Sequence, residues 1–85
     1  MTQIVVWSKD NCPFCSKAMT LLDSMNINYE VRKVGTEWTR EELLESVPNA
    51  RSVPQILINN ELIGGYKEFV AYIEDTGFNG TGHSL

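Results

Sequence analysis

Several features typical of other protein classes are missing from this 85-residue chain. No apolar run approaches the ~20 residues that a membrane-spanning helix needs. The N-terminal segment lacks a basic stretch followed by a long apolar stretch, which is the signature of a secretory signal. The net charge of −4 argues against general nucleic-acid binding, because such binding needs lysine and arginine to neutralise phosphates. We therefore expect a cytoplasmic protein with no membrane and no nucleic-acid partner.

Cysteine and histidine are also scarce. The chain has two cysteines, Cys12 and Cys15, and one histidine, His83, near the C-terminus. A closed zinc site needs about four nitrogen or sulfur ligands, so no metal is expected. A disulfide that closes so short a loop removes little entropy from the unfolded chain, so the pair is a poor structural staple. In a cytoplasmic chain, such a closely spaced pair beside a strand and a helix indicates redox chemistry instead.

The composition is that of a folded globular protein, with 42% hydrophobic and 21% charged residues. A chain of this length has no room for a second core, so we predict one domain over residues 1–85. We also expect a monomer. The end of the chain is rich in glycine and has little periodicity. This composition predicts a frayed tail over residues 79–85.

The pattern of apolar residues predicts three helices and four strands. Apolar residues recur three or four positions apart in the helices, and they alternate or form short runs in the strands. The predicted elements are a strand at 3–8, a helix at 13–25, a strand at 26–34, a helix within 36–47, strands at 54–58 and 61–65, and a helix at 66–75. Thr39 is the expected N-cap of the second helix, with Glu42 as its capping-box partner.

The element order β-α-β-α-β-β-α predicts the fold class. The first two strands are joined through a helix, so they should be parallel by the right-handed crossover rule. Asn59 and Asn60 separate the last two strands and suit a tight antiparallel hairpin, because asparagine tolerates positive φ. We therefore predict an α/β fold, in which helices flank both faces of a four-stranded mixed sheet.

The position of each cysteine predicts its role. The thiolate, not the thiol, attacks a disulfide, and free cysteine has a pKa of ~8.5. Cys12 directly precedes the helix that begins at Pro13, where unpaired N–H groups and the helix dipole favour a negative sulfur. Lys9 adds a nearby cation. Cys15 lies one turn inside the helix and leans back toward Cys12. We predict that Cys12 attacks the substrate sulfur and that Cys15 then resolves the mixed disulfide.

Three blocks of sequence together resemble the glutaredoxin family, a branch of the thioredoxin fold. The blocks are SKDNCPFC, SVPQILI and ELIGGYKEF, and the likeness runs from Ile4 to about Asp75. The small size and the aromatic residue after the two glycines are similar to phage or bacterial members. The resemblance implies a thioredoxin-like fold, with Cys12 as the nucleophile and Cys15 as the resolving thiol. It implies the host cytoplasm if the chain is viral.

The resemblance also implies a glutathione site. The residues that match it are Lys9, Phe14, Val53, Pro54, Gly65, Tyr66 and Lys67. Pro54 matches the family's cis-proline, and the Val53 backbone would pair with the glutathione cysteine. Many members have an acidic residue at the position of Lys67. A lysine there favours contact with the carboxylate of the γ-glutamyl group over contact with its ammonium.

Four further residues are candidates for the same site. Arg51 is either a source of positive charge beside the V-P block or an ordinary exposed arginine. Gln55 and Arg40 are weaker candidates, and Glu68 could replace the missing acid at position 67.

The leading functional hypothesis is a thiol–disulfide oxidoreductase that reduces protein disulfides and protein–glutathione mixed disulfides. No flavin or nicotinamide motif is present, so the electrons must come from another molecule, and the resemblance implies glutathione as the reducing co-substrate. One alternative is a hydrogen donor for ribonucleotide reductase that thioredoxin reductase recharges, which Tyr66 permits. Another is an iron–sulfur cluster carrier that forms a glutathione-bridged dimer, which Cys15 and Pro13 disfavour.

Overall fold

The structure is a computed structural model that describes residues 2–78. The predicted frayed tail at 79–85 and His83 lie outside the described residues. In chain order the elements are β1 (Ile4–Ser8), α1 (Pro13–Ser24), β2 (Glu30–Lys33), α2 (Arg40–Ser46), β3 (Gln55–Ile58), β4 (Glu61–Gly64) and α3 (Tyr66–Thr76). This order confirms the predicted β-α-β-α-β-β-α fold. Between residues 2 and 78, no helix combines the length and apolar character needed to span a membrane.

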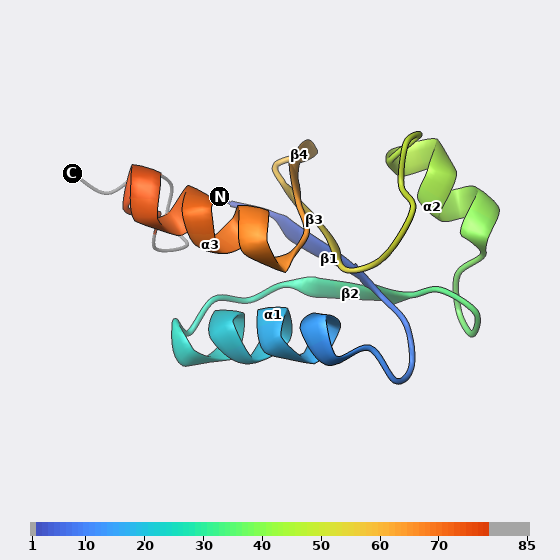
Figure 1. Ribbon diagram of the computed structural model, residues 1–85, viewed down its shortest axis with the longest axis horizontal. Helices are drawn as coiled ribbons and strands as arrows, with labels where there is room; N and C mark the ends of the chain where they lie inside the picture. Colours follow the sequence, from blue (N-terminus) through green and yellow to red (C-terminus); the bar gives the residue numbers. More distant parts are fainter. Residues whose placement is uncertain (1, 79–85) are drawn as a thin grey trace.

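The four strands form one mixed sheet in the order β2-β1-β3-β4 (Figure 1). β1 pairs in parallel with β2 and antiparallel with β3, and β4 completes the sheet antiparallel to β3. Asn59 and Asn60 both adopt positive φ, 52° and 68°, in the predicted tight turn between β3 and β4. The central strand β1 therefore ends beside the start of α1, where the cysteines lie.

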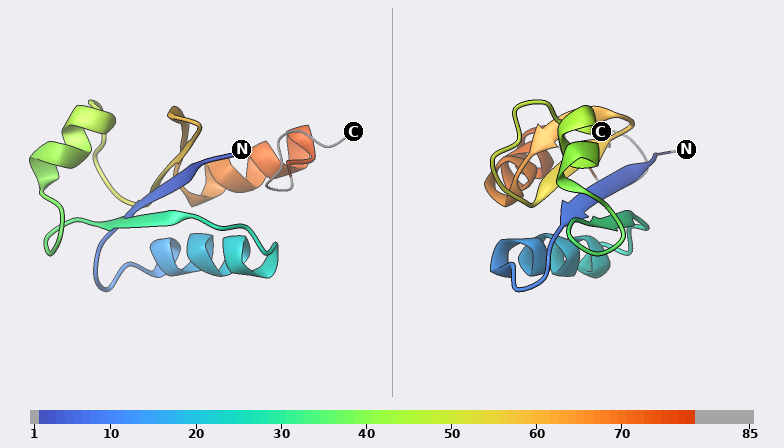
Figure 2. Two further views of the ribbon diagram at one scale, coloured as in Figure 1. Left: turned by 180° about the vertical axis from the view of Figure 1, so that it is seen from behind. Right: turned by 90° about the vertical axis from the view of Figure 1, so that its right-hand side faces the viewer.

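The side chains of β1 alternate between two hydrophobic cores. Ile4 and Val6 pack with residues of α1 and α3 on one face of the sheet. Val5 and Trp7 pack with residues of α2 on the other face. Figure 2 shows the sheet between these helices from two further directions. Burial on both faces explains why the first strand is a nearly continuous apolar run.

The second strand is shorter than the prediction of 26–34. It forms only at Glu30–Lys33. Asn26 takes a positive φ of 57°. The Ile27 N–H donates to the Leu22 carbonyl over 3.1 Å. These residues close the end of α1 with a turn, and Ile27 is buried in the core instead of extending the strand.

Candidate active site

Cys12 and Cys15 lie at the N-terminal end of α1 and are joined by a disulfide, with their Cα atoms 5.2 Å apart. Cys12 is the N-cap of the helix, and Pro13 follows in its first turn. The Cys15 N–H donates a hydrogen bond to Cys12 Sγ over 3.2 Å. An amide of the first helical turn therefore faces the Cys12 sulfur, as the sequence predicts.

The two cysteines differ in exposure. Cys15 is 1% exposed and Cys12 is 9% exposed. Cys12 also lines a surface groove, together with Lys9 and Lys33 among others. Cys12 is thus the more exposed of the two cysteines, and its role as the nucleophile stays a prediction.

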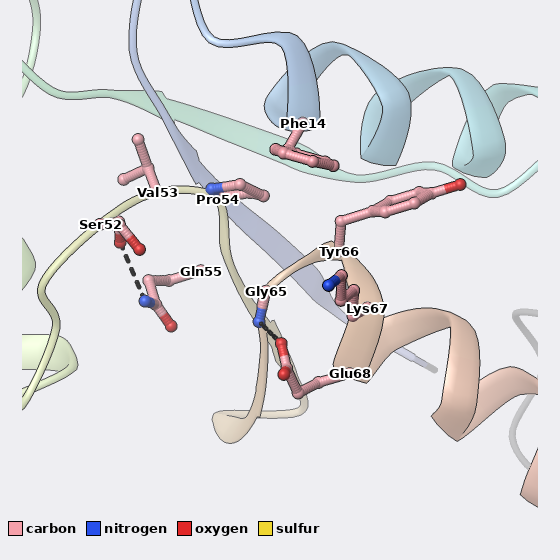
Figure 3. A pocket seen from close by; sticks show the side chains of 9 residues that line it. All are labelled: Phe14, Ser52, Val53, Pro54, Gln55, Gly65, Tyr66, Lys67 and Glu68. Atoms are coloured by element: carbon pink, nitrogen blue, oxygen red, sulfur yellow. Dashed lines mark hydrogen bonds between the residues drawn. The ribbon is translucent and has the colours of Figure 1, made fainter.

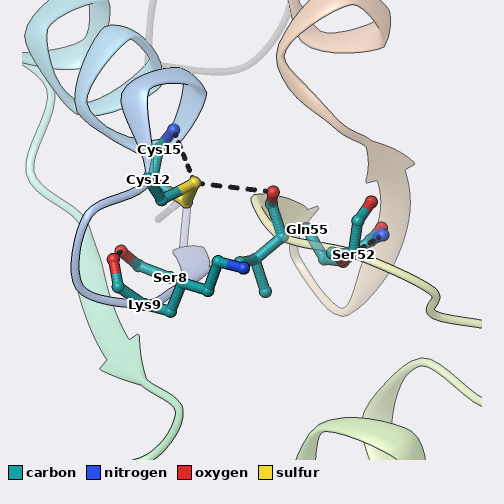
Figure 4. Close-up of a disulfide and its surroundings, with 7 residues drawn as sticks. Ser8, Lys9, Cys12, Cys15, Ser52 and Gln55 are labelled. Carbon is teal, nitrogen blue, oxygen red and sulfur yellow. Dashed lines mark hydrogen bonds between the residues drawn. A yellow bond between two sulfur atoms is a disulfide. The ribbon is translucent and has the colours of Figure 1, made fainter.

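The loop before β3 approaches Cys12 from the opposite side. Cys12 Sγ lies 3.6 Å from the Val53 carbonyl oxygen (Figure 4). The Val53–Pro54 peptide bond is cis, as the resemblance implies, and Pro54 is buried. The Gln55 side-chain amide donates to the Ser52 carbonyl over 2.9 Å and braces this loop. An extended ligand cysteine could therefore meet the Val53 backbone and the Cys12 sulfur together.

A groove of about 270 Å³ leads away from Val53; we call it the glutathione groove, after the ligand that the sequence resemblance implies. Its lining includes six of the seven residues predicted to bind glutathione: Phe14, Val53, Pro54, Gly65, Tyr66 and Lys67. Figure 3 shows that these residues come from the start of α1, the loop before β3 and the start of α3. Segments far apart in the sequence thus line one groove.

Lys9, the seventh predicted residue, lines an adjacent groove on the other side of Val53; we call it the basic groove. Arg40 and Arg51 line it too, so both of these candidates lie near the site. Ser52 and Val53 border both grooves. A ligand that crosses Val53 therefore meets cations at both of its ends: Lys9 with the two arginines at one end, and Lys67 at the other.

An exposed aromatic pair borders the glutathione groove. Phe14 is 49% exposed, and its ring centroid lies 6.1 Å from that of Tyr66 at an interplanar angle of 34°. Lys17 Nζ lies 5.1 Å from the Phe14 ring centroid, within the range of a cation–π contact. A large apolar side chain held in water at a groove edge is suited to contact a ligand or a partner protein.

The start of α3 is closed by Glu68. Its Oε1 accepts a hydrogen bond from the Gly65 N–H over 2.9 Å. A Cβ at Gly64, where φ is +123°, would lie 2.9 Å from Glu68 Cβ and Cγ. The glycine pair thus lets Glu68 fold back over the helix start. This cap was not predicted, although an acidic residue three positions after an N-cap is its usual signal.

An ion pair beside the cysteines was also not predicted. Lys33 Nζ at the end of β2 lies 3.1 Å from Asp10 Oδ1, in the loop that leads to Cys12. Both residues line the groove that Cys12 lines. Nothing in the sequence spacing could have paired them, because β2 meets this loop only through the parallel register with β1.

Comparison with known proteins decides the family. The glutaredoxin family profile matches residues 4–63. The chain belongs to the glutaredoxin family. Glutaredoxins are thiol–disulfide oxidoreductases, which fits a cysteine pair joined by a disulfide at a helix start.

Named relatives agree with this assignment. Glutaredoxin 1 of Rickettsia conorii is 38% identical over 64 residues, which cover 73% of this chain and 63% of that protein. This glutaredoxin thus spans less than two thirds of the length of that relative. Among solved structures, glutaredoxin 1 of Francisella tularensis has a TM-score of 0.76 at 22% identity, covering 88% of this chain and 95% of its own. A buckwheat glutaredoxin–glutathione complex has a TM-score of 0.75 at 27% identity, covering 87% and 70%.

The described part of this glutaredoxin, residues 2–78, contains no group of three or more His, Cys, Asp or Glu residues placed to hold a metal ion.

Proposed function

We propose that this glutaredoxin is a glutathione-dependent oxidoreductase that reduces protein–glutathione mixed disulfides and protein disulfides. The observation that supports it best is spatial: six predicted glutathione residues line one groove, and that groove includes Val53, whose carbonyl oxygen lies 3.6 Å from Cys12 Sγ. The solved complex of the related buckwheat protein contains glutathione. Such chemistry requires a reducing compartment with a glutathione pool, so we assign the protein to the cytoplasm.

Glutathione carries two carboxylates and one ammonium group, and the charges of the site match them. One carboxylate would lie near Lys9 and Arg51 in the basic groove, and the γ-glutamyl carboxylate would lie near Lys67. The γ-glutamyl ammonium would face Glu68, which lines the same groove as Lys67. Glu68 would therefore take the role of the acidic residue that many family members have at position 67.

Reduction of a mixed disulfide needs Cys12 alone. The Cys12 thiolate attacks the glutathione sulfur, a Cys12–glutathione disulfide forms, and the protein cysteine leaves as a thiolate that takes up a proton. A second glutathione thiolate then attacks the bound glutathione sulfur, which frees Cys12 and releases glutathione disulfide. The net reaction consumes one free glutathione: the glutathionyl group of the substrate and this second glutathione leave together as glutathione disulfide, so one disulfide bond is broken and one is formed.

Reduction of a protein disulfide needs both cysteines. Cys12 attacks one substrate sulfur and the other leaves as a thiol after protonation. Cys15 then attacks Cys12 Sγ, which releases the reduced protein and forms the Cys12–Cys15 disulfide. Two glutathione molecules return this disulfide to two thiols and leave as one molecule of glutathione disulfide. The 5.2 Å separation of the Cα atoms suits this exchange.

The test is steady-state turnover of a glutathione mixed disulfide by the wild type, Cys12→Ser and Cys15→Ser. We expect loss of turnover in Cys12→Ser and retention in Cys15→Ser, because the second thiol is not used with this substrate. Loss in both variants would contradict the assignment of nucleophile and resolver. Replacing glutathione with thioredoxin reductase as the source of electrons tests the reductant, and we expect turnover only with glutathione.

A further inference from the structure

Four surface grooves surround the cysteine pair and share residues with their neighbours. Besides the glutathione and basic grooves, there is a cysteine groove that includes Cys12, Ser16 and Lys33. A helix groove along α1 includes Ser16, Lys17 and Tyr66. Ser16 joins the cysteine and helix grooves, and Tyr66 joins the helix and glutathione grooves. The basic and cysteine grooves share Lys9, so the four form a continuous ring.

The positively charged side chains of the protein are concentrated on this ring. Six of the seven lysines and arginines line it, but only two of the eleven acidic residues, Asp10 and Glu68, do so. The cations are Lys9, Lys17, Lys33, Arg40, Arg51 and Lys67. A protein with a net charge of −4 thus presents a locally cationic face around its reactive sulfur. Such a field raises the local concentration of anionic partners and repels cationic ones.

Glutathione does not account for the whole ring. In the proposed function it occupies the glutathione and basic grooves, on either side of Val53. Lys17 and Lys33 line the two remaining grooves. Lys33 is paired with Asp10, whereas Lys17 is exposed and rests over the Phe14 ring. The cysteine and helix grooves are therefore free for the rest of the substrate.

We propose that the cysteine and helix grooves receive the polypeptide part of a glutathionylated substrate, and that they fit an acidic segment next to the modified cysteine. The inference rests on the proposed function and names its substrate class. Lys17 attracts acidic side chains that flank the cysteine, and Lys33 contributes less because Asp10 offsets its charge. The exposed Phe14 supplies apolar contact at the edge. This preference for acidic segments acts on the rate at which the substrate meets the enzyme and on its orientation. It is therefore strongest at low ionic strength.

Three matched glutathionylated peptides test this selection. Each has one cysteine, flanked by aspartate and glutamate, by asparagine and glutamine, or by lysine. The mixed disulfide of glutathione with 2-mercaptoethanol is the control, because its non-glutathione half has neither a charge nor a peptide. For the wild type we expect kcat/KM to fall from the acidic to the neutral to the basic peptide, by about tenfold over the series at low salt, and the differences to shrink as salt is added.

Variants of Lys17 distinguish an effect of this side chain from an effect of the protein's net charge. We expect Lys17→Gln to lower kcat/KM for the acidic peptide by about threefold, with no change for the 2-mercaptoethanol substrate. Lys17→Arg should retain the wild-type rates because it keeps the charge. Lys17→Gln combined with Glu74→Gln, on the exposed side of α3, restores the net charge of −4 and should stay slow with the acidic peptide.

Equal kcat/KM for the acidic and basic peptides would overturn the inference, and so would recovery of the rate in the Lys17→Gln, Glu74→Gln double variant. An equal loss with the 2-mercaptoethanol substrate in Lys17→Gln would also overturn it, because Lys17 would then act on the chemistry or the fold. Absence of turnover with the 2-mercaptoethanol substrate in the wild type is a different failure. It would remove the proposed function itself.

Discussion

The Cys15 backbone N–H donates a hydrogen bond to Cys12 Sγ over 3.2 Å. The donor belongs to the first turn of α1, and the acceptor belongs to the residue that caps that turn. A sulfur in this position satisfies an amide that would otherwise lack a partner, and it does so better as an anion than as a neutral thiol. The same contact therefore caps the helix and prepares the nucleophile.

Gly64 should be the least replaceable glycine of the site. Gly64→Ala combines an unfavourable φ of +123° with a Cβ only 2.9 Å from two Glu68 atoms, so the free energy of unfolding should fall by about 2 kcal/mol. Gly35→Ala is the matched control, because its φ is +99° and a Cβ there meets nothing within 4 Å. Urea denaturation of both variants gives the difference, and equal losses would refute the close approach of Glu68.

Glu68→Ala should destabilise the protein by about 1 kcal/mol, because it removes the carboxylate that accepts from the Gly65 N–H. It should also raise the KM for glutathione, since the proposed partner of the γ-glutamyl ammonium is lost. Glu74→Ala, on the same helix and exposed, is the control for helix propensity and net charge. The role assigned to Glu68 would be wrong if the two variants had the same stability and the same KM.

Lys67→Gln should raise the KM for glutathione by about three- to tenfold and leave kcat nearly unchanged, because it removes binding to a carboxylate remote from the sulfur. Lys67 is exposed, so stability should not change measurably. The KM of the wild type should rise with salt, and that of the variant should respond less. A KM that is unaffected by the substitution would place the γ-glutamyl carboxylate elsewhere.

The free energy of unfolding should fall at alkaline pH, in part because Tyr29 loses its proton more readily in the unfolded state. Burial, a hydrogen bond to Asp23 and the charge of Asp23 raise the pKa of Tyr29 above its ordinary value of 10.0. The folded state then keeps a proton that the unfolded state loses, so this contribution is complete below pH 10.0 and is lost as the pH rises through the folded-state pKa.

The matched variant for this effect is Tyr29→Phe, whose stability should decline less steeply than that of the wild type above about pH 10. Urea denaturation across the alkaline range measures both slopes. Parallel pH profiles would show that Tyr29 has the same pKa in the folded and unfolded states.

Local sequence signals predicted the elements that depend on local chemistry. The apolar stripe after Pro13 gave α1, and the spacing of Thr39 and Glu42 gave the cap of α2, which forms with hydrogen bonds of 3.1 and 2.8 Å. The strand predicted at 26–34 was too long. The alternation of apolar and polar residues continues through the turn that ends α1, where Ile27 is buried, so it cannot distinguish this turn from a strand. There, tertiary burial decided the outcome.

Sequence motifs predicted the parts of the candidate site that they contain, but not the side-chain contacts that form only in the folded chain. The cysteine pair and the V-P and Gly-Gly blocks located the glutathione groove. The Lys33–Asp10 ion pair and the position of Lys17 over Phe14 were missed, because they arise from sheet register and from one helical turn of exposed surface. Segregation of the cations onto one face also becomes visible only when the grooves are assembled.

The most direct test of the account is the titration of Cys12 in the reduced protein, followed by the rate of alkylation of this thiol as a function of pH. The Cys15→Ser variant limits the signal to one sulfur and keeps the Cys15 backbone amide. We predict a midpoint within the range of ~3.5–7.5 seen for cysteines at helix starts, so that Cys12 is a thiolate at neutral pH. A midpoint near ~8.5, the value of free cysteine, would contradict the account.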